Sequence, residues 1–183
     1  MQIYPLQPGG AAEGVALASG PVTLSDMTAL PRFGLKGRGS ADWLAAQGYN
    51  LPEINRLSDG VLRLGGNDLV VIEGVDDLRA AWQAADAPKG YNAWREETWA
   101  WMHLSGPRLD DLMAKICPVD LRANTFTEGQ ISQTRVGYTE AVVWRAHHKG
   151  LDGFCVLFDI SATAFFAQAI ETAAQEFKKE AVL

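Results

Sequence analysis

The same succession of predicted elements occurs twice along the chain, and this repetition limits the possible folds more than any other feature. In the first half, a short strand around Phe33 and Leu35 leads through Gly37 to a helix over 41–47. In the second half, a strand over 99–104 leads through Gly106 to another helix. Both halves then continue with strands and close with a helix. The sequence therefore predicts an α+β fold of two similar βαββα lobes, in which helices cover small mixed sheets.

Local signals support the later elements of each half. The turn Gly65-Gly66-Asn67-Asp68 separates two apolar runs and predicts a hairpin. Leu78, Ala81 and Trp82 recur at helical spacing. In the second half, Ser161 is a suitable cap for a long helix that ends near residue 177 and carries an apolar stripe.

The first 31 residues differ in composition from the rest of the chain. They contain no lysine or arginine and are rich in glycine, alanine and proline. They predict an extended arm with one edge strand at Val22–Leu24. The predicted parts, which together make one compact domain, are the amino-terminal arm (1–31), the first lobe (32–86), a connector (87–97) and the second lobe (98–183).

Composition argues against several classes of partner and site. The formal net charge is −6, and no basic stripe indicates a nucleic-acid surface. Cys117 and Cys155, the only cysteines, form no CxxC pair, so neither zinc nor a disulfide framework is expected. The longest uncharged apolar stretch, Ile160–Ile170, is about half a membrane span. Since the amino terminus lacks signal-peptide features, we expect a cytoplasmic protein without membrane contact.

A search for chemistry-bearing motifs identifies no catalytic, cofactor-binding or metal-binding residue. Gly37 and Gly39 lie between a strand and a helix, but the third glycine of a dinucleotide fingerprint is missing. His147 and His148 are adjacent on an extended segment, so they point to opposite faces and make a poor chelate. His103 alternates with apolar residues and fits a structural role in a sheet.

Acidic pairs give no stronger signal. Asp110 and Asp111 lie in the first turn of a predicted helix, where they stabilise the helix dipole. Glu96 and Glu97 fall in a solvated turn.

Several segments resemble the gamma subunit of heterotetrameric sarcosine oxidase. The resemblance rests on Met102-His-Leu-Ser-Gly-Pro-Arg-Leu-Asp-Asp-Leu-Met113, Cys117-Pro-Val-Asp-Leu121, Phe126, Gly129, Gln133-Thr134, Val22-Thr-Leu24 and Phe33-Gly-Leu-Lys-Gly37. The LSGP and PxDL patterns also suit the wider superfamily of folate-binding aminomethyltransferases. The order, spacing and chain length favour the gamma subunit, whose fold is that of the aminomethyltransferase amino-terminal region.

This resemblance implies a non-catalytic subunit of an oxidoreductase complex in sarcosine catabolism. The complex demethylates sarcosine to glycine, forms hydrogen peroxide and passes the one-carbon unit to tetrahydrofolate. The implied partners are the alpha, beta and delta subunits. FAD, FMN, NAD and tetrahydrofolate are expected on those subunits, and no cofactor is expected on this chain.

An alternative is a stand-alone folate-dependent protein of the aminomethyltransferase kind. In that family an acidic residue serving folate chemistry follows the strand equivalent to 131–136. Glu140 is the only nearby carboxylate here. The chain is also much shorter than a full aminomethyltransferase, which disfavours this alternative. A third hypothesis is an orphan domain whose partners have been lost.

The amino-terminal arm and nearby apolar residues are expected to form a main contact with partner subunits. The arm carries many large apolar side chains and few charges, unlike a solvated tail. The arm residues after Val22 fit packing against their own domain as well as packing against a partner subunit. Residues 1–19 favour a partner subunit. Tryptophan is enriched in interface anchors. The predicted interface residues are Ile3, Tyr4, Leu6, Val15, Leu17 and Trp94.

Overall fold

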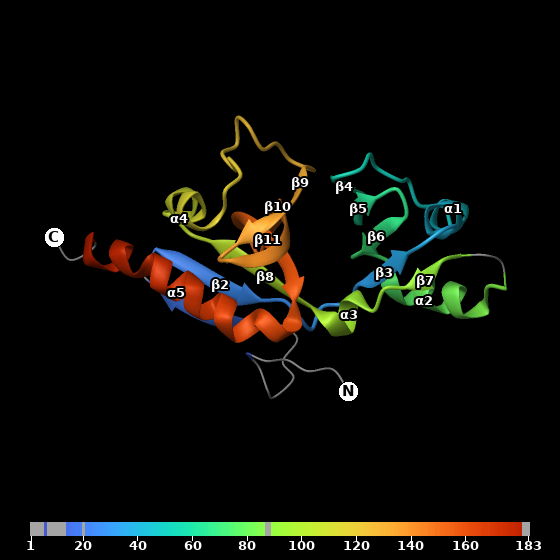
Figure 1. The fold of residues 1–183 in the computed structure, drawn as a ribbon, viewed down its shortest axis with the longest axis horizontal. Coiled ribbons are helices and arrows are strands. Elements are labelled where there is room, and N and C mark those ends of the chain that lie inside the picture. The colour runs from blue at the N-terminus through green and yellow to red at the C-terminus, as the bar shows by residue number, and fades with distance from the viewer. Residues whose placement is uncertain (1–5, 7–13, 20, 87–88, 181–183) are drawn as a thin grey trace. The chain divides into compact units, whose positions relative to one another are not determined.

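The computed structural model describes residues 6, 14–19, 21–86 and 89–180 (Figure 1). These residues form two antiparallel sheets and five α-helices, an α+β fold. They divide into two compact units. Unit 1 contains the described residues up to Leu30, Thr98–Glu128 and those from Ser132 onward, and unit 2 contains Pro31–Glu97 and Gly129–Ile131.

Unit 1 is built on a six-stranded sheet. The strands, in spatial order, are β1 (Gly14–Ser19), β2 (Val22–Asp26), β8 (Trp99–Ser105), β11 (Leu151–Asp159), β10 (Thr139–His148) and β9 (Ile131–Val136). The helices of this unit are α4 (Leu109–Ile116) and α5 (Thr163–Glu180), the latter preceded by the 3-10 turn Ile160–Ala162. The ribbon of α5 lies along this sheet in Figure 1.

Alternation along the strands places one apolar face of this sheet beneath the helices. Met102 and Leu104 of β8 are buried there, and Phe166 of α5 packs into the same cluster. The rings of Phe158 and Phe166 are stacked with centroids 4.3 Å apart. Their burial joins the sheet to α5 and stabilises unit 1.

Unit 2 is built on a five-stranded sheet. The strands, in spatial order, are β4 (Arg56–Ser58), β5 (Val61–Gly65), β6 (Asp68–Val71), β3 (Phe33–Lys36) and β7 (Tyr91–Asn92). Its helices are α1 (Ser40–Ala46), α2 (Val75–Ala84) and α3 (Arg95–Thr98). In its core, Trp82 presents an edge-to-face contact to Phe33 at 5.8 Å and to Trp43 at 5.0 Å.

Each unit contains the succession strand, helix, three strands, helix, which is one strand more than the predicted βαββα pattern. Unit 1 has β1 and β2 in addition, and unit 2 has β7 and α3. The sheet orders also correspond, because β4-β5-β6-β3 in unit 2 matches β9-β10-β11-β8 in unit 1. Gly37 and Gly106 both follow the entry strand directly, and both have a positive φ. The prediction of mixed parallel and antiparallel sheets is wrong. Tight turns connect the successive strands, and neighbouring strands are therefore antiparallel.

The predicted arm and connector contain more regular structure than expected. The segment Val22–Leu24 belongs to β2, which lies inside the sheet between β1 and β8 rather than at its edge. The connector contains β7 and the start of α3. The fully buried Arg32 holds this segment, since its Nε donates to the Arg95 carbonyl at 3.0 Å and its guanidinium also reaches the Glu96 carbonyl at 3.1 Å. Within the described ranges, no helix is long and apolar enough to cross a membrane.

Candidate functional site

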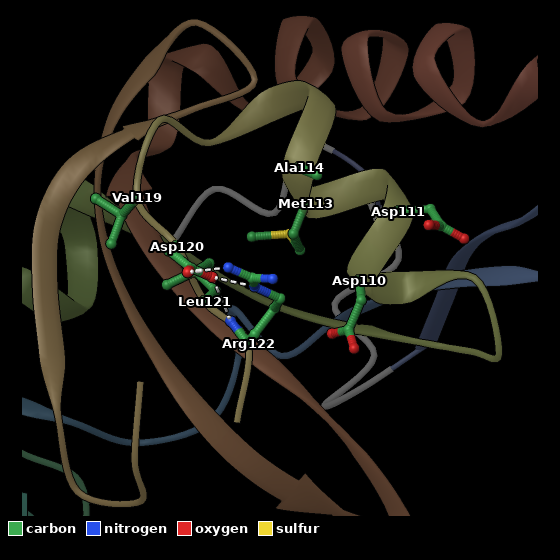
Figure 2. A pocket seen from close by; sticks show the side chains of 8 residues that line it. All are labelled: Asp110, Asp111, Met113, Ala114, Val119, Asp120, Leu121 and Arg122. Carbon is green, nitrogen blue, oxygen red and sulfur yellow. Dashed lines mark hydrogen bonds and ion pairs between the residues drawn. The ribbon is translucent and has the colours of Figure 1, made fainter. Parts of the chain in front are cut away.

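A pocket of about 200 Å³ lies between α4 and the loop that follows it (Figure 2). Met113, Val119 and Leu121 supply apolar lining, and Ala114 completes it. Its polar lining is Asp110, Asp111, Asp120 and Arg122. The residues come from one short stretch of chain, because the helix ends at Cys117-Pro118 and the following loop folds back beside it.

Asp120 and Arg122 form a bidentate ion pair in this pocket. Arg122 donates from Nε to Asp120 Oδ1 at 2.9 Å and from its terminal nitrogen to Oδ2 at 2.7 Å. The side chain and backbone of Arg122 hold the pKa of Asp120 well below its usual range, and the pair raises the pKa of Arg122. The Thr125 hydroxyl donates a hydrogen bond to Asp120 Oδ2 at 3.3 Å. A carboxylate held ionised in this way is a poor general acid.

The remaining acidic residues of the pocket do not complete a catalytic arrangement. Asp111 accepts from Arg108 Nε at 2.6 Å, and in Figure 2 it points away from the Asp120–Arg122 pair. Asp110 lies beside it in the first turn of α4, where a carboxylate favours the helix dipole. No serine, cysteine or histidine lines the pocket. The arrangement suits a stabilised surface loop better than acid–base or nucleophilic chemistry.

A wider groove of about 540 Å³ follows α5. Ile116, Ala169 and Ala173 supply apolar lining, and the exposed rings of Tyr138 and Phe165 belong to its wall. The remaining lining residues are Lys115, Gln168 and Thr172. Tyr138 is 86% exposed and has a φ of 66°, an uncommon conformation for an aromatic residue. The groove offers apolar contact area rather than reactive groups, and sequence periodicity gave no signal for it.

The carboxylate considered for folate chemistry lies on the surface in an ion pair. Glu140 Oε1 accepts from Arg135 Nε at 2.6 Å, and the side chains are 76% and 71% exposed. The pair raises the pKa of Arg135. Glu140 therefore forms a solvated cross-strand contact instead of facing a cavity.

The glycines between β3 and α1 form a tight turn. Gly37 and Gly39 have φ values of 90° and 91°. A Cβ at Gly37 would lie 2.7 Å from the Tyr91 ring, and one at Gly90 would lie 2.4 Å from the Lys36 carbonyl. The close approach of the β7 segment explains the glycines at 37 and 90 without a bound phosphate.

The metal-ligating residue types form no cluster of three or more within the described part of the chain. Cys117 and Cys155 are both free and buried. Burial raises the pKa of Cys155 to about 12 and also raises the pKa of Cys117. Both thiols therefore remain protonated and poorly nucleophilic near neutral pH.

The predicted interface residues occupy three different settings. Ile3 and Tyr4 lie outside the described residues. Leu6 is partly buried and packs against the core cluster of unit 1. Val15 and Leu17 belong to β1, whose backbone pairs with Ser25 and Leu24 of β2.

Trp94 lies in unit 2, between β7 and α3, and is 59% exposed with a φ of 51°. Its backbone amide donates to Asn92 Oδ1 at 2.8 Å, which supports this turn. Partner contact through these residues remains a prediction.

Comparison with known proteins gives a structural match without a sequence match. No family model and no curated protein matches the chain. The fold is nevertheless similar to that of a chain of known structure. That chain belongs to the heterotetrameric sarcosine oxidase from Corynebacterium sp. U-96, determined in complex with pyrrole 2-carboxylate. The TM-score is 0.72 at 22% sequence identity, over 88% of this chain and 88% of the other.

Proposed function

We propose that this chain is the non-catalytic gamma subunit of a heterotetrameric sarcosine oxidase. In this proposal, alpha, beta and delta subunits carry the flavins, NAD and tetrahydrofolate, and the complex works in the cytoplasm. The chain supports assembly while sarcosine is demethylated and its one-carbon unit is transferred on those subunits.

The observation that carries the proposal is the fold similarity over 88% of both chains. A match to only one unit would suit many α+β proteins, whereas this one includes most of a chain that belongs to a four-subunit assembly. The resemblance at Met102–Met113 agrees with it, because this segment forms the end of β8 and the beginning of α4. The chemistry of the acidic residues also suits a supporting role, since Asp120 is held in an ion pair in its pocket and Glu140 is paired at the surface.

Co-expression with candidate alpha, beta and delta subunits tests the proposal. We expect one copy of this chain to co-purify with each assembly, and sarcosine-dependent hydrogen peroxide formation to require the assembled complex. An Asp110→Asn variant should leave kcat and KM unchanged, because this carboxylate has no catalytic part in the proposal. An active complex that assembles equally well without the chain would contradict it.

Tetrahydrofolate binding separates this proposal from the stand-alone alternative. We expect calorimetry with the isolated chain to give no saturable heat. Saturable binding that weakens in Glu140→Gln would favour the folate-dependent alternative, and the ion pair with Arg135 provides the matched control variant Arg135→Gln. Loss of binding in the Glu140 variant alone would assign the effect to the carboxylate rather than to the pair.

A further inference from the structure

All three histidines of the chain gather at one end of the unit 1 sheet. His103 lies in β8, and His147 and His148 are the last two residues of β10. Strand β11 runs between them, with His147 opposite Asp152 and His103 opposite Cys155. The three titratable rings thus surround the tip of the β10–β11 hairpin.

One pair of rings meets across β11. The His103 and His148 centroids are 5.4 Å apart with an interplanar angle of 58°. Gly153 makes this contact possible, because a Cβ there would lie 2.6 Å from His103 Nε2. His103 is only 1% exposed, and its Nε2 has no hydrogen-bond partner within the residues that the structure describes. A proton on this ring would therefore bring an unpaired charge into the interior.

The third histidine acts on the opposite face of the hairpin. His147 Nδ1 lies 2.8 Å from Asp152 Oδ1, and both side chains are largely exposed. The hydrogen bond to His147 lowers the pKa of Asp152. This contact joins neighbouring residues of β10 and β11 at the surface.

The charges around His103 oppose its protonation. Burial, followed by the neighbouring His148, lowers the pKa of His103; His147 adds a smaller effect, and the Ala146 backbone acts in the opposite direction. On the same face, β11 supplies the protonated Cys155 and β2 supplies the non-ionisable Ser25.

The charged groups nearest to the tip lie elsewhere, and Glu140 and Asp159 belong to the far end of the hairpin. Arg145 faces the opposite side, where its guanidinium lies 4.7 Å from the centre of the Phe154 ring and donates to the Leu121 carbonyl at 2.8 Å. Lys149 lies in the turn at the tip and adds positive charge there. Asp152 also lies on the opposite side, paired with His147. Among these described groups, no carboxylate faces His103 and would compensate an imidazolium.

We propose that contact between the β10–β11 tip and β8 is proton-linked: the His103 ring packs against His148 over Gly153 while His103 is neutral, and the two rings separate when His103 takes up a proton. The backbone pairing of β10 with β11 keeps the two strands joined during this change. Acidification therefore releases the tip from β8 without unpairing the hairpin.

The sign of the pH dependence follows from His103. Its pKa in the folded chain lies below the ordinary value of 6.5. The stabilising contribution of the neutral ring is fully present above 6.5 and decreases as pH falls through the lowered folded pKa. Release of the tip should consequently occur on the acidic side of neutrality.

Proton NMR of the imidazole rings in the full chain tests the proposal, because three histidines can be assigned by single substitutions. In the unsubstituted chain we expect His103 to titrate below 6.5, and cross-relaxation between the His103 and His148 rings to disappear on acidification. His148→Gln should shift the His103 titration upward. His147→Gln is the matched control, and it should shift His103 less.

A second measurement keeps the test decisive if a variant fails to fold. Amide hydrogen exchange of Gly153 in the unsubstituted chain, corrected for its intrinsic pH dependence, should lose protection over the same pH range as the ring contact. Ring contact that persists throughout acidification would overturn the proposal. A His103 titration at the ordinary value, or one unchanged by His148→Gln, would overturn it equally.

Discussion

Replacing Gly153 by alanine tests whether strand packing at the β8–β11 contact is as close as the structure shows. A Cβ at this position would lie 2.1 Å from the Leu104 carbonyl oxygen, and 2.6 Å from His103 Nε2. Ordinary carbon–oxygen contacts between strands are about 3.3–3.6 Å. Since the first obstacle is backbone, a side-chain rotation cannot remove it, and β8 and β11 must move apart.

We expect Gly153→Ala to lower the free energy of unfolding, although alanine is intrinsically more favourable than glycine in a strand. Alanine in an unobstructed strand is more stable than glycine by about 0.5–1 kcal/mol, because glycine loses more backbone entropy on folding. Overpacking of a filled interior costs about 1–3 kcal/mol, and backbone contact places Gly153→Ala toward the upper end. We therefore expect a net loss of about 1–2 kcal/mol in the free energy of unfolding.

Urea unfolding followed by tryptophan fluorescence and circular dichroism measures this loss. Gly66→Ala is the matched control, because a Cβ at Gly66 meets no atom within 4 Å. Its effect should stay within about 0.5 kcal/mol, as for ordinary surface substitutions. Gly153→Ala should cost less in a His103→Ala background than in the original chain, but it should still destabilise, since the Leu104 carbonyl remains. A Gly153→Ala chain as stable as the original would refute the reasoning.

Three further substitutions or reactions examine the core, the buried arginine and the thiols. Phe166→Ala should cost about 3–5 kcal/mol in urea unfolding, whereas the exposed neighbour variant Phe165→Ala should change stability little. Arg32→Met removes the donors to two α3 carbonyls, and we expect a loss of about 1–3 kcal/mol with faster amide exchange in unit 2; unchanged exchange would contradict the assigned role. Because its pKa is raised to about 12, Cys155 should react with a thiol reagent at pH 8 only after unfolding, as mass spectrometry can show; rapid labelling of the folded chain would disprove this.

Local sequence patterns predicted the elements that show clear alternation or are bounded by turn residues. Alternation from Trp99 to Leu104 predicted β8, and the glycine turn before Asp68 predicted the β5–β6 hairpin. The correspondence between Gly37 and Gly106 also appeared in the sequence, because each marks a strand that leads into a helix. Such signals are local, since side-chain periodicity follows the backbone conformation of a few successive residues.

Short strands without such signals were missed. Strand β4 contains only Arg56–Ser58, which is too short to show a clear alternation. It exists because its backbone pairs with β5 and because Leu57 donates to the Gly129 carbonyl at 2.7 Å. Strand β7 likewise depends on β3, with which Tyr91 and Asn92 pair.

The sequence by itself determined the main strands and helices, the strand–glycine–helix entry that occurs twice, and the lack of a familiar catalytic motif. Only the tertiary structure decided that Arg32 would meet the carbonyls of α3 and that His103 would meet His148 across Gly153. These contacts depend on strand register, and a shift of one residue turns a side chain to the opposite face of its sheet. Periodicity identifies a buried face, but the partner of each side chain is fixed only when distant strands are paired.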